Sequence, residues 1–289
     1  MSAQGVQPAS AALRIFSSAD GSAGAKSVRE PNYIFTDAAM EVEDIRLRLI
    51  EQRADPLTIG RLVDLGVASG SQCLEVGSGR GSIARWLAGQ VGPEGHVVAS
   101  DIDCRYLTDM PENVEVRTLD IRTDTPECGL YDLVHCRTVL IHVPDPRDAL
   151  QRMATALKPG GLLLVEEADY GLYAFGGHPD AAWLTDKCNE MFAALAARRL
   201  SNPYLGRSLP GMLTTVGVSV EGGHVFTSVA LPGEPAFEFE RQTLEAAGPF
   251  MISAGIFTEA DHAAAQAIWN HPSTVMTTAS LISAWGHRS

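Results

Sequence analysis

Long hydrophobic runs and an export signal are both missing from this 289-residue sequence. Its apolar runs fall far short of the 18 or more residues that a membrane span needs, and no basic start is followed by an apolar segment. Cysteine is scarce: there are five, with no C-x-x-C pair among them. These absences argue against a disulfide framework and a zinc site, and they predict a reducing, cytoplasmic location. We expect each cysteine to be a small buried hydrophobe: Cys73, Cys104, Cys128, Cys136 and Cys188.

Positive charge is also scarce. Lys and Arg together number 22 against 35 Asp and Glu, which gives a net charge of −13. Proteins that bind nucleic acid usually carry a basic face, and the arginine groups Arg46-Leu47-Arg48 and Arg198-Arg199 are predicted to be solvated helix faces. The expected partner is therefore a small molecule, with neither nucleic acid nor a membrane. The predicted N-terminal helices offer a surface for a homo-oligomer.

Apolar residues make up 45% of the sequence, enough for a substantial core. In the middle of the chain, strand and helix patterns alternate across short connections, which predicts a parallel sheet with helices on both faces. The strands are expected near 72–76, 96–100, 114–119, 131–136 and 161–166, with helices at 81–91 and 145–157. Before them we expect helices at 41–52 and from Asp55-Pro56 to Gly66. After them we expect a strand near 218–230, helices at about 238–254 and 258–269, and a last strand near 275–285.

The most informative segment runs from Leu74 to Gly81, with the sequence Leu-Glu-Val-Gly-Ser-Gly-Arg-Gly. Its apolar start predicts a buried parallel strand, Glu75 can face a cationic group of a ligand, and three glycines let the backbone approach that ligand closely. Helical spacing of apolar residues follows directly, so the loop opens a helix. Strand, glycine loop and helix start together predict a nucleotide-type cofactor site.

The spacing of the glycines decides between cofactors. A dinucleotide fingerprint that starts at Gly77 and Gly79 needs its third glycine at position 82, where Ser82 stands. The second predicted strand ends in Asp101, and an acid at that strand end can accept two hydrogen bonds from a ribose diol. A nucleoside cofactor other than a nicotinamide dinucleotide is therefore favoured.

The pattern E-x-G-x-G-x-G resembles the first motif of class I S-adenosylmethionine-dependent methyltransferases, in the broad group of bacterial small-molecule enzymes. Tyr131 to Arg137 resembles the fourth-strand motif of that family, and Lys158-Pro159-Gly160-Gly161 matches the turn before its fifth strand. The resemblance covers about residues 70–170. It implies an α/β, Rossmann-like, doubly wound and mostly parallel seven-stranded sheet whose last strand is antiparallel, together with N-terminal helices and a helical insertion over the active site.

This resemblance also implies a division of the chain and a set of site residues. We expect a disordered tail at 1–30, a helical lid at 31–68, a catalytic domain at 69–170 and 216–289, and a substrate-capping insertion at 171–215. The predicted cofactor-binding residues are Glu75, Gly77, Ser78, Gly79, Gly81, Asp101, Ile102, Asp120, Ile121, Tyr33 and His135. The predicted catalytic residues are His142, as a general base, and Glu167, and the predicted substrate-binding residues are Arg207, Asp169 and Tyr170. For His142 a purely structural role in the turn is the competing interpretation.

The expected activity is transfer of a methyl group from S-adenosylmethionine to an O, N or C atom of a small molecule, plausibly a specialised metabolite. Metal-dependent relatives place an acid beyond the fourth strand, whereas this sequence has Arg137 and Thr138 there, so no metal is expected. Two alternatives stay open. The scaffold could catalyse cyclisation or only bind the cofactor, because cofactor motifs report binding and not turnover. A nicotinamide-dependent oxidoreductase is disfavoured by the glycine spacing and by Glu75.

Overall fold

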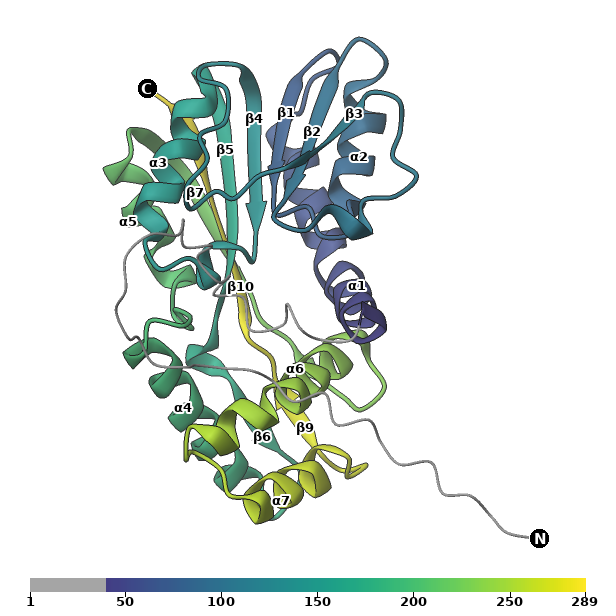
Figure 1. Cartoon of the computed structure of the whole chain (residues 1–289), viewed down its shortest axis with the longest axis vertical. Helices are drawn as coiled ribbons and strands as arrows, with labels where there is room; N and C mark the ends of the chain where they lie inside the picture. The colour runs from purple at the N-terminus through teal and green to yellow at the C-terminus, as the bar shows by residue number, and fades with distance from the viewer. Residues whose placement is uncertain (1–39) are drawn as a thin grey trace, which may run out of the picture.

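The computed structural model describes residues 40–289. The chain forms a large part around a central sheet and a smaller part at one end of it (Figure 1). The predictions for the tail at 1–30 and for Tyr33 lie outside the described residues.

The central sheet has seven strands in the order β3-β2-β1-β4-β5-β10-β7. The first five are parallel, and β10 runs antiparallel to both of its neighbours, β5 and β7. The predicted mostly parallel sheet with an antiparallel last strand is thus confirmed. The strands are β1 (Gln72–Val76), β2 (His96–Asp101), β3 (Val114–Thr118), β4 (Tyr131–Arg137), β5 (Leu157–Asp169), β7 (Val218–Phe226) and β10 (Ser280–Arg288).

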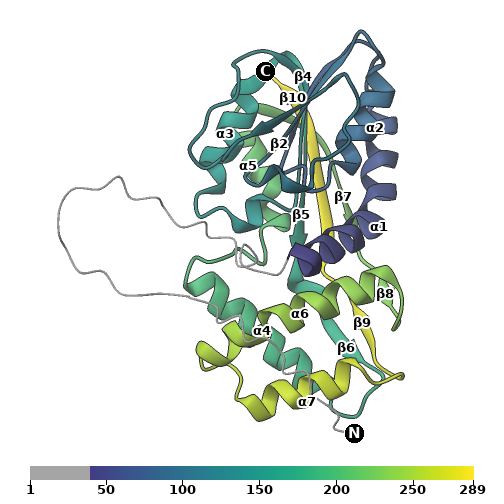
Figure 2. The ribbon, with the colours of Figure 1, turned by 45° about the vertical axis from the view of Figure 1, so that its right-hand side comes forward.

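Helices cover both faces of this sheet, as the alternating pattern predicts (Figure 2). One face carries α1 (Met40–Leu65) and α2 (Ser82–Val91), and the other carries α3 (Pro146–Ala156) and α5 (Leu209–Thr215). Each face has its own apolar core, with Leu87 of α2 in one and Leu150 of α3 in the other. Because the strand order reverses between β1 and β4, the carboxyl ends of these strands are where a doubly wound fold places its ligand.

The first helix corrects a prediction. Two helices separated at Asp55-Pro56 were expected, but α1 is a single helix with Pro56 inside it. Proline removes one backbone donor from a helix, and this loss is tolerated where tertiary contacts hold both sides. Here Arg53 is bonded to Glu240 and Thr58 to Glu166, one contact on each side of the proline.

A third apolar core lies beyond the sheet and forms what we call the cap, residues 170–204 and 229–279. Its small sheet has the antiparallel order β6-β9-β8, and helices lie beside it (Figure 1). Trp269, Phe237 and Met276 are fully buried there. The elements are β6 (Ala174–Gly176), β8 (Val229–Ala230), β9 (Val275–Thr277), α4 (Ala181–Ala197), α6 (Pro235–Ser253) and α7 (Glu259–Trp269).

The cap differs from the predicted insertion at 171–215. Leu209 and Leu213 of α5 pack into the core of the large part, while residues 229–279 supply most of the cap. The strands predicted at 218–230 and 275–285 are each two strands, because the chain leaves the central sheet and joins the small one. A continuous apolar run does not reveal such a change of sheet.

The predicted burial of every cysteine is correct for three of them. Cys73, Cys136 and Cys188 are buried, Cys104 is intermediate and Cys128 is exposed, so the prediction is wrong for Cys128. All five are free thiols. Within residues 40–289, no helix combines the length and apolarity required to traverse a lipid bilayer.

Candidate functional site

A cavity of about 310 Å³ opens at the carboxyl ends of the parallel strands and continues into the cap. We call the part lined by residues 75–80, Ser82, 101–103, 105–106 and 119–122 the sheet half. The cap half is the part lined by Ala168, Tyr170, Tyr173, Met191, Phe192, Leu195, Leu200, Ser201, Pro203, Phe239, Glu240, Thr243, Leu244 and Ala247. One helix, α1, lines both halves, from Glu43 to Leu57.

The glycine loop forms the wall of the sheet half. Gly77, Gly79 and Gly81 have φ values of 73°, 55° and 78°, in the left-handed region that glycine adopts at no steric cost. A Cβ at Gly77 would lie 2.1 Å from Cγ2 of Val139, so only glycine fits there. The amides of Gly77 and Ser78 donate to the Ser100 carbonyl at 2.8 and 2.9 Å, which fixes the loop to β2.

Glu75 presents a buried carboxylate at this wall. Its Oε1 lies 3.7 Å from Nδ1 of His135, while its Oε2 has no hydrogen-bond partner among residues 40–289. A buried carboxylate oxygen without a partner is costly, so it favours a ligand that brings a cationic N–H group.

Asp101 lies at the end of β2 and lines the same half of the cavity. Its carboxylate accepts hydrogen bonds from the amides of Gly79, at 2.8 Å, and Asp103, at 3.0 Å. Burial raises the pKa of Asp101, and the two amide bonds partly oppose this shift. Each carboxylate oxygen has further acceptor capacity toward the cavity.

Ile102, Asp120 and Ile121 complete the sheet half. Ile102 is exposed and Ile121 buried, and both line the cavity. Asp120 is already engaged by Arg122, with Nε–Oδ1 at 2.8 Å and Nη2–Oδ2 at 2.7 Å. The hydrogen bonds from Arg122 lower the pKa of Asp120. A ligand amino group would therefore share this carboxylate with Arg122.

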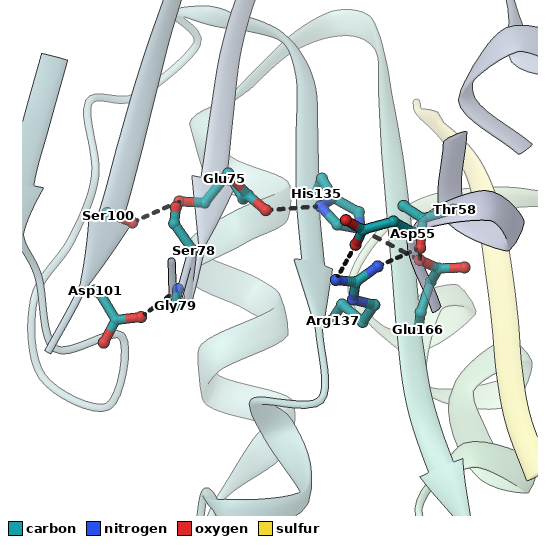
Figure 3. A network of polar contacts seen from close by, with 10 residues as sticks. All are labelled: Asp55, Thr58, Glu75, Ser78, Gly79, Ser100, Asp101, His135, Arg137 and Glu166. Atoms are coloured by element: carbon teal, nitrogen blue, oxygen red, sulfur yellow. Dashed lines mark hydrogen bonds and ion pairs between the residues drawn. The ribbon is translucent and has the colours of Figure 1, made fainter. Parts of the chain in front are cut away.

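His135 does not line the cavity but lies behind Glu75, fully buried between two carboxylates (Figure 3). Its Nε2 is 3.3 Å from Oε2 of Glu166 on β5, so the three side chains cross three adjacent strands. Burial alone would lower the pKa of His135, but Glu166 and Glu75 raise it. Burial alone would raise the pKa of Glu166, but His135 lowers it to about 2. Both shifts favour the charged forms of the pair, an imidazolium beside a carboxylate.

The same network ties α1 to the sheet, a connection that no local sequence pattern indicates. Glu166 also accepts from Thr58, at 2.5 Å, and from Ser283 of β10, at 2.6 Å. Arg137, next along β4, donates to Thr58 at 2.8 Å and to Asp55 at 2.7 Å (Figure 3). Asp55, where a second helix was predicted to begin, lies within α1 and is a partner of Arg137.

Glu167 lies away from the cavity, contrary to the place expected of a catalytic group. Its carboxylate accepts from the amides of Val139 at 3.0 Å, Leu140 at 2.6 Å and Ile141 at 3.2 Å. Burial raises its pKa to about 8, against the effect of these donors. The contacts hold the turn that carries His142.

His142 lies at the end of that turn and lines the cavity. Burial lowers the pKa of His142 to about 3, and the positive charge of Arg46 acts in the same direction. The imidazole is therefore neutral across the physiological pH range, when it can accept a hydrogen bond but is a weak general base.

Asp169 and Arg207, predicted to bind substrate, bind each other. Nε and Nη2 of Arg207 donate to the two oxygens of Asp169 at 2.7 and 2.5 Å. Neither residue lines the cavity, and the side chain of Arg207 is 56% exposed. Tyr170 does line the cavity, and its ring lies 4.3 Å from that of Phe192.

The cap half contains buried charges that the sequence analysis missed. Arg53 pairs with Glu240 of α6 at 2.8 Å, with both side chains at most 10% exposed. Arg46, predicted to be solvated, is buried and pairs with Glu43 at 2.7 Å. Both guanidinium groups lie within 6 Å of the Phe239 ring. The spacing of Arg46 and Arg53, seven residues apart on one helix, is the signal that could have placed them on one face.

Residues 41–221 match the model of the methyltransferase domain family, which covers more than half of the chain. The chain belongs to this family. The predicted class I S-adenosylmethionine-dependent methyltransferase is thereby confirmed as a family, and its sheet order agrees with that assignment.

This methyltransferase is similar in sequence to proteins of several organisms. It is 32% identical over 152 residues to methyltransferase str3 of Strobilurus tenacellus, which covers 52% of this chain and 53% of the relative. It is 30% identical over 175 residues to the ubiquinone/menaquinone biosynthesis C-methyltransferase UbiE of Ectopseudomonas mendocina, which covers 55% and 66%. The chain thus spans about half to two thirds of the length of these curated relatives.

The methyltransferase also shares its fold with solved structures. Phosphoethanolamine N-methyltransferase 2 of Haemonchus contortus, in complex with S-adenosyl-L-methionine, matches with a TM-score of 0.55 and 14% identity over 89% of this chain and 59% of that one. This likeness concerns the fold.

Proposed function

We propose that this methyltransferase transfers the methyl group of S-adenosylmethionine to an O, N or C atom of a small molecule, without a metal. The observation that carries the proposal is the continuity of the cavity. A glycine loop leads directly into a chamber under the cap, and beside this loop lies the buried carboxylate of Glu75, whose Oε2 has no hydrogen-bond partner among residues 40–289. A donor and an acceptor bound in the two halves would meet at their junction.

The residues of the sheet half fit the proposed cofactor. Glu75 would hold the ammonium group, because its Oε2 needs a donor. Asp101 would accept from the ribose hydroxyls, while Ile102 and Ile121 would flank the adenine ring. The glycine loop supplies backbone that the ligand can approach closely. When bound, the cofactor supplies an activated methyl group on a sulfonium.

Positioning is the main contribution that the chain would make to the reaction. In-line displacement needs the acceptor held collinear with the methyl group, and fixing this geometry accounts for a large part of such rate enhancements. Walls from α1 and the cap exclude water from the acceptor. His142, neutral because burial lowers its pKa to about 3, would orient an acceptor O–H or N–H by accepting its hydrogen bond rather than remove the proton.

Two further observations support a small metabolite made inside the cell as the acceptor. The relatives include methyltransferase str3 and UbiE. The name of UbiE assigns it to the biosynthesis of ubiquinone and menaquinone, which are small molecules. All five cysteines are free, which fits a reducing compartment. At the end of β4, near the place where metal-dependent relatives carry an acid, this chain has Arg137, which is bonded to Asp55.

The proposal is tested in two steps. First, S-adenosylmethionine and its demethylated product should raise the melting temperature of the protein, and NAD should not. Second, a donor with a radiolabelled methyl group should label a member of a panel of small-molecule acceptors. Stabilisation by NAD alone would reverse the choice of cofactor. Binding with no transfer to any acceptor, or with release of a cyclised product, would favour the alternative scaffold functions.

A further inference from the structure

The walls of the cap half are apolar and aromatic. This part of the cavity is lined by Met191, Phe192 and Leu195 of α4 and by Phe239 and Leu244 of α6. Burying apolar ligand surface against such walls is favourable in proportion to the area removed from water. The cap half is therefore suited to a ligand with a hydrophobic body.

The charges in this half compensate one another. Arg53 is paired with Glu240 and Arg46 with Glu43, so two cations face two anions. His142 adds no charge, because burial lowers its pKa to about 3. A charged ligand would lose its hydration here without meeting an unbalanced opposite charge, and burial of a charge without a partner is strongly unfavourable. An uncharged ligand incurs no such penalty.

One polar group in the cap half lacks a partner. The side chain of Tyr173 is 3% exposed and lines the cavity, yet its hydroxyl has no hydrogen-bond partner among residues 40–289. Burial raises the pKa of this hydroxyl well above its ordinary value, so it keeps its proton and is a donor. Its ring is held by edge-to-face contacts with Phe175 and Phe192, both at 5.5 Å between centroids.

We propose that the cap half binds an uncharged ring compound that carries a hydroxyl or carbonyl oxygen, and that the Tyr173 hydroxyl donates a hydrogen bond to this oxygen. The aromatic walls recognise the ring, the compensated charges reject ions, and Tyr173 selects the oxygen. This inference rests on the proposed function, because the compound would be the methyl acceptor.

The test compares 2-naphthol with naphthalene, which has the same ring system without the oxygen. Both are titrated, by their fluorescence, into the whole protein saturated with S-adenosylhomocysteine. A hydrogen bond of ordinary net strength should make 2-naphthol bind about fivefold more tightly. Tyr173→Phe should remove this difference, and the matched control Tyr204→Phe, outside the cavity, should keep it. Phosphoethanolamine, added as a competitor, should not displace 2-naphthol.

The outcomes separate the two proposals. Affinity for S-adenosylhomocysteine is measured first, and its absence contradicts the proposed function. Binding of S-adenosylhomocysteine without binding of 2-naphthol, or displacement of 2-naphthol by phosphoethanolamine, contradicts only the inference about the acceptor. Equal affinity of the wild type for 2-naphthol and naphthalene contradicts the role of Tyr173, and this comparison needs no variant. Retention of the difference in Tyr173→Phe contradicts it as well.

Discussion

The two halves of the cavity are stabilised in different ways. The sheet half depends on backbone geometry and buried charge, with three glycines in the left-handed region and the Glu75–His135–Glu166 network behind them. The cap half depends on apolar packing around Phe237, Met251 and Trp269. A site that binds one particular cofactor needs hydrogen-bonding groups in defined positions. A site for an apolar acceptor needs an apolar surface that is complementary in shape to the acceptor. The contrast predicts that single substitutions affect one half and spare the other.

The largest effect is expected for His135→Gln. It removes the cation between two buried carboxylates, and leaving a buried charge without its partner costs about 3–5 kcal/mol. Urea unfolding should show this loss in the free energy of unfolding, against about 1 kcal/mol for Ser283→Ala, which removes one hydrogen bond to Glu166. Affinity for S-adenosylhomocysteine should fall and affinity for 2-naphthol should not.

The ion pair of His135 and Glu166 makes the free energy of unfolding depend on pH. Because the pKa of Glu166 is lowered from 4.5 to about 2, its stabilising contribution is complete above pH 4.5 and is lost as the pH falls toward 2. The difference in unfolding free energy between wild type and His135→Gln should shrink over that range. A constant difference would contradict the ion pair.

The next effect concerns the cap alone. Phe237→Ala removes a fully buried ring and should lower the free energy of unfolding by about 3 kcal/mol. Affinity for S-adenosylhomocysteine should stay within about twofold, because no wall of the sheet half changes. Leu172→Ala, at a side chain 62% exposed, is the control and should change stability by less than about 0.5 kcal/mol. If Phe237→Ala abolished cofactor binding, the two halves would not be independent.

Gly77→Ala should act on the sheet half alone. The new Cβ would lie 2.1 Å from Val139 at a φ of +73°, so the loop must move. We expect about a hundredfold loss of affinity for S-adenosylhomocysteine, or about 2.7 kcal/mol, measured by calorimetry. Gly70→Ala has a similar backbone angle, +81°, with nothing within 4 Å of the new atom. It therefore controls for backbone strain, and an equal loss there would refute the steric argument.

The smallest effect is expected for Asp101→Asn. The asparagine amide has one acceptor oxygen, whereas the aspartate carboxylate has two and carries a negative charge. Affinity for S-adenosylhomocysteine should therefore fall about tenfold. Asp145→Asn, at an exposed side chain, should change nothing. Because burial raises the pKa of Asp101, wild-type affinity should decline on acidification at a higher pH than an exposed aspartate, with its value of 3.8, would give. No change in Asp101→Asn would remove this residue from the site.

The sequence indicated many of the residues that line the sheet half, though not the place of His135 behind Glu75, and few of those that line the cap half. The glycine loop and Asp101 follow from short patterns, because a loop that opens a helix and the end of the next strand are local features. Tyr173, Arg53 and Glu240 meet through packing of segments far apart in the chain, and no local pattern encodes that meeting.

The mistaken predictions have the same origin. Asp169 is the last residue of β5, at the expected edge, yet it is bound by Arg207, 38 residues further on. Glu167, beside it, is directed to the backbone of the turn at 139–141. An acidic residue at the end of a strand is a candidate for ligand binding or catalysis, but its sequence position does not show whether another part of the chain already pairs with it. The same holds for Pro56, whose effect on α1 is overridden by contacts with β5 and α6.

The position of α1 along both halves of the cavity has a consequence for the entry and exit of ligands. At one end Arg80 of the glycine loop is bonded to Asp44, in the middle Arg53 is bonded to Glu240 of α6, and further on Thr58 is bonded to Glu166 of β5. Because α1 is one continuous helix with contacts to the glycine loop, the cap and the central sheet, it cannot move away from any one of these without straining its contacts with the other two. A movement of α1 that admits a ligand to one half of the cavity therefore also changes the contacts that α1 makes in the other half. Entry and exit of the cofactor and of the acceptor are thus coupled.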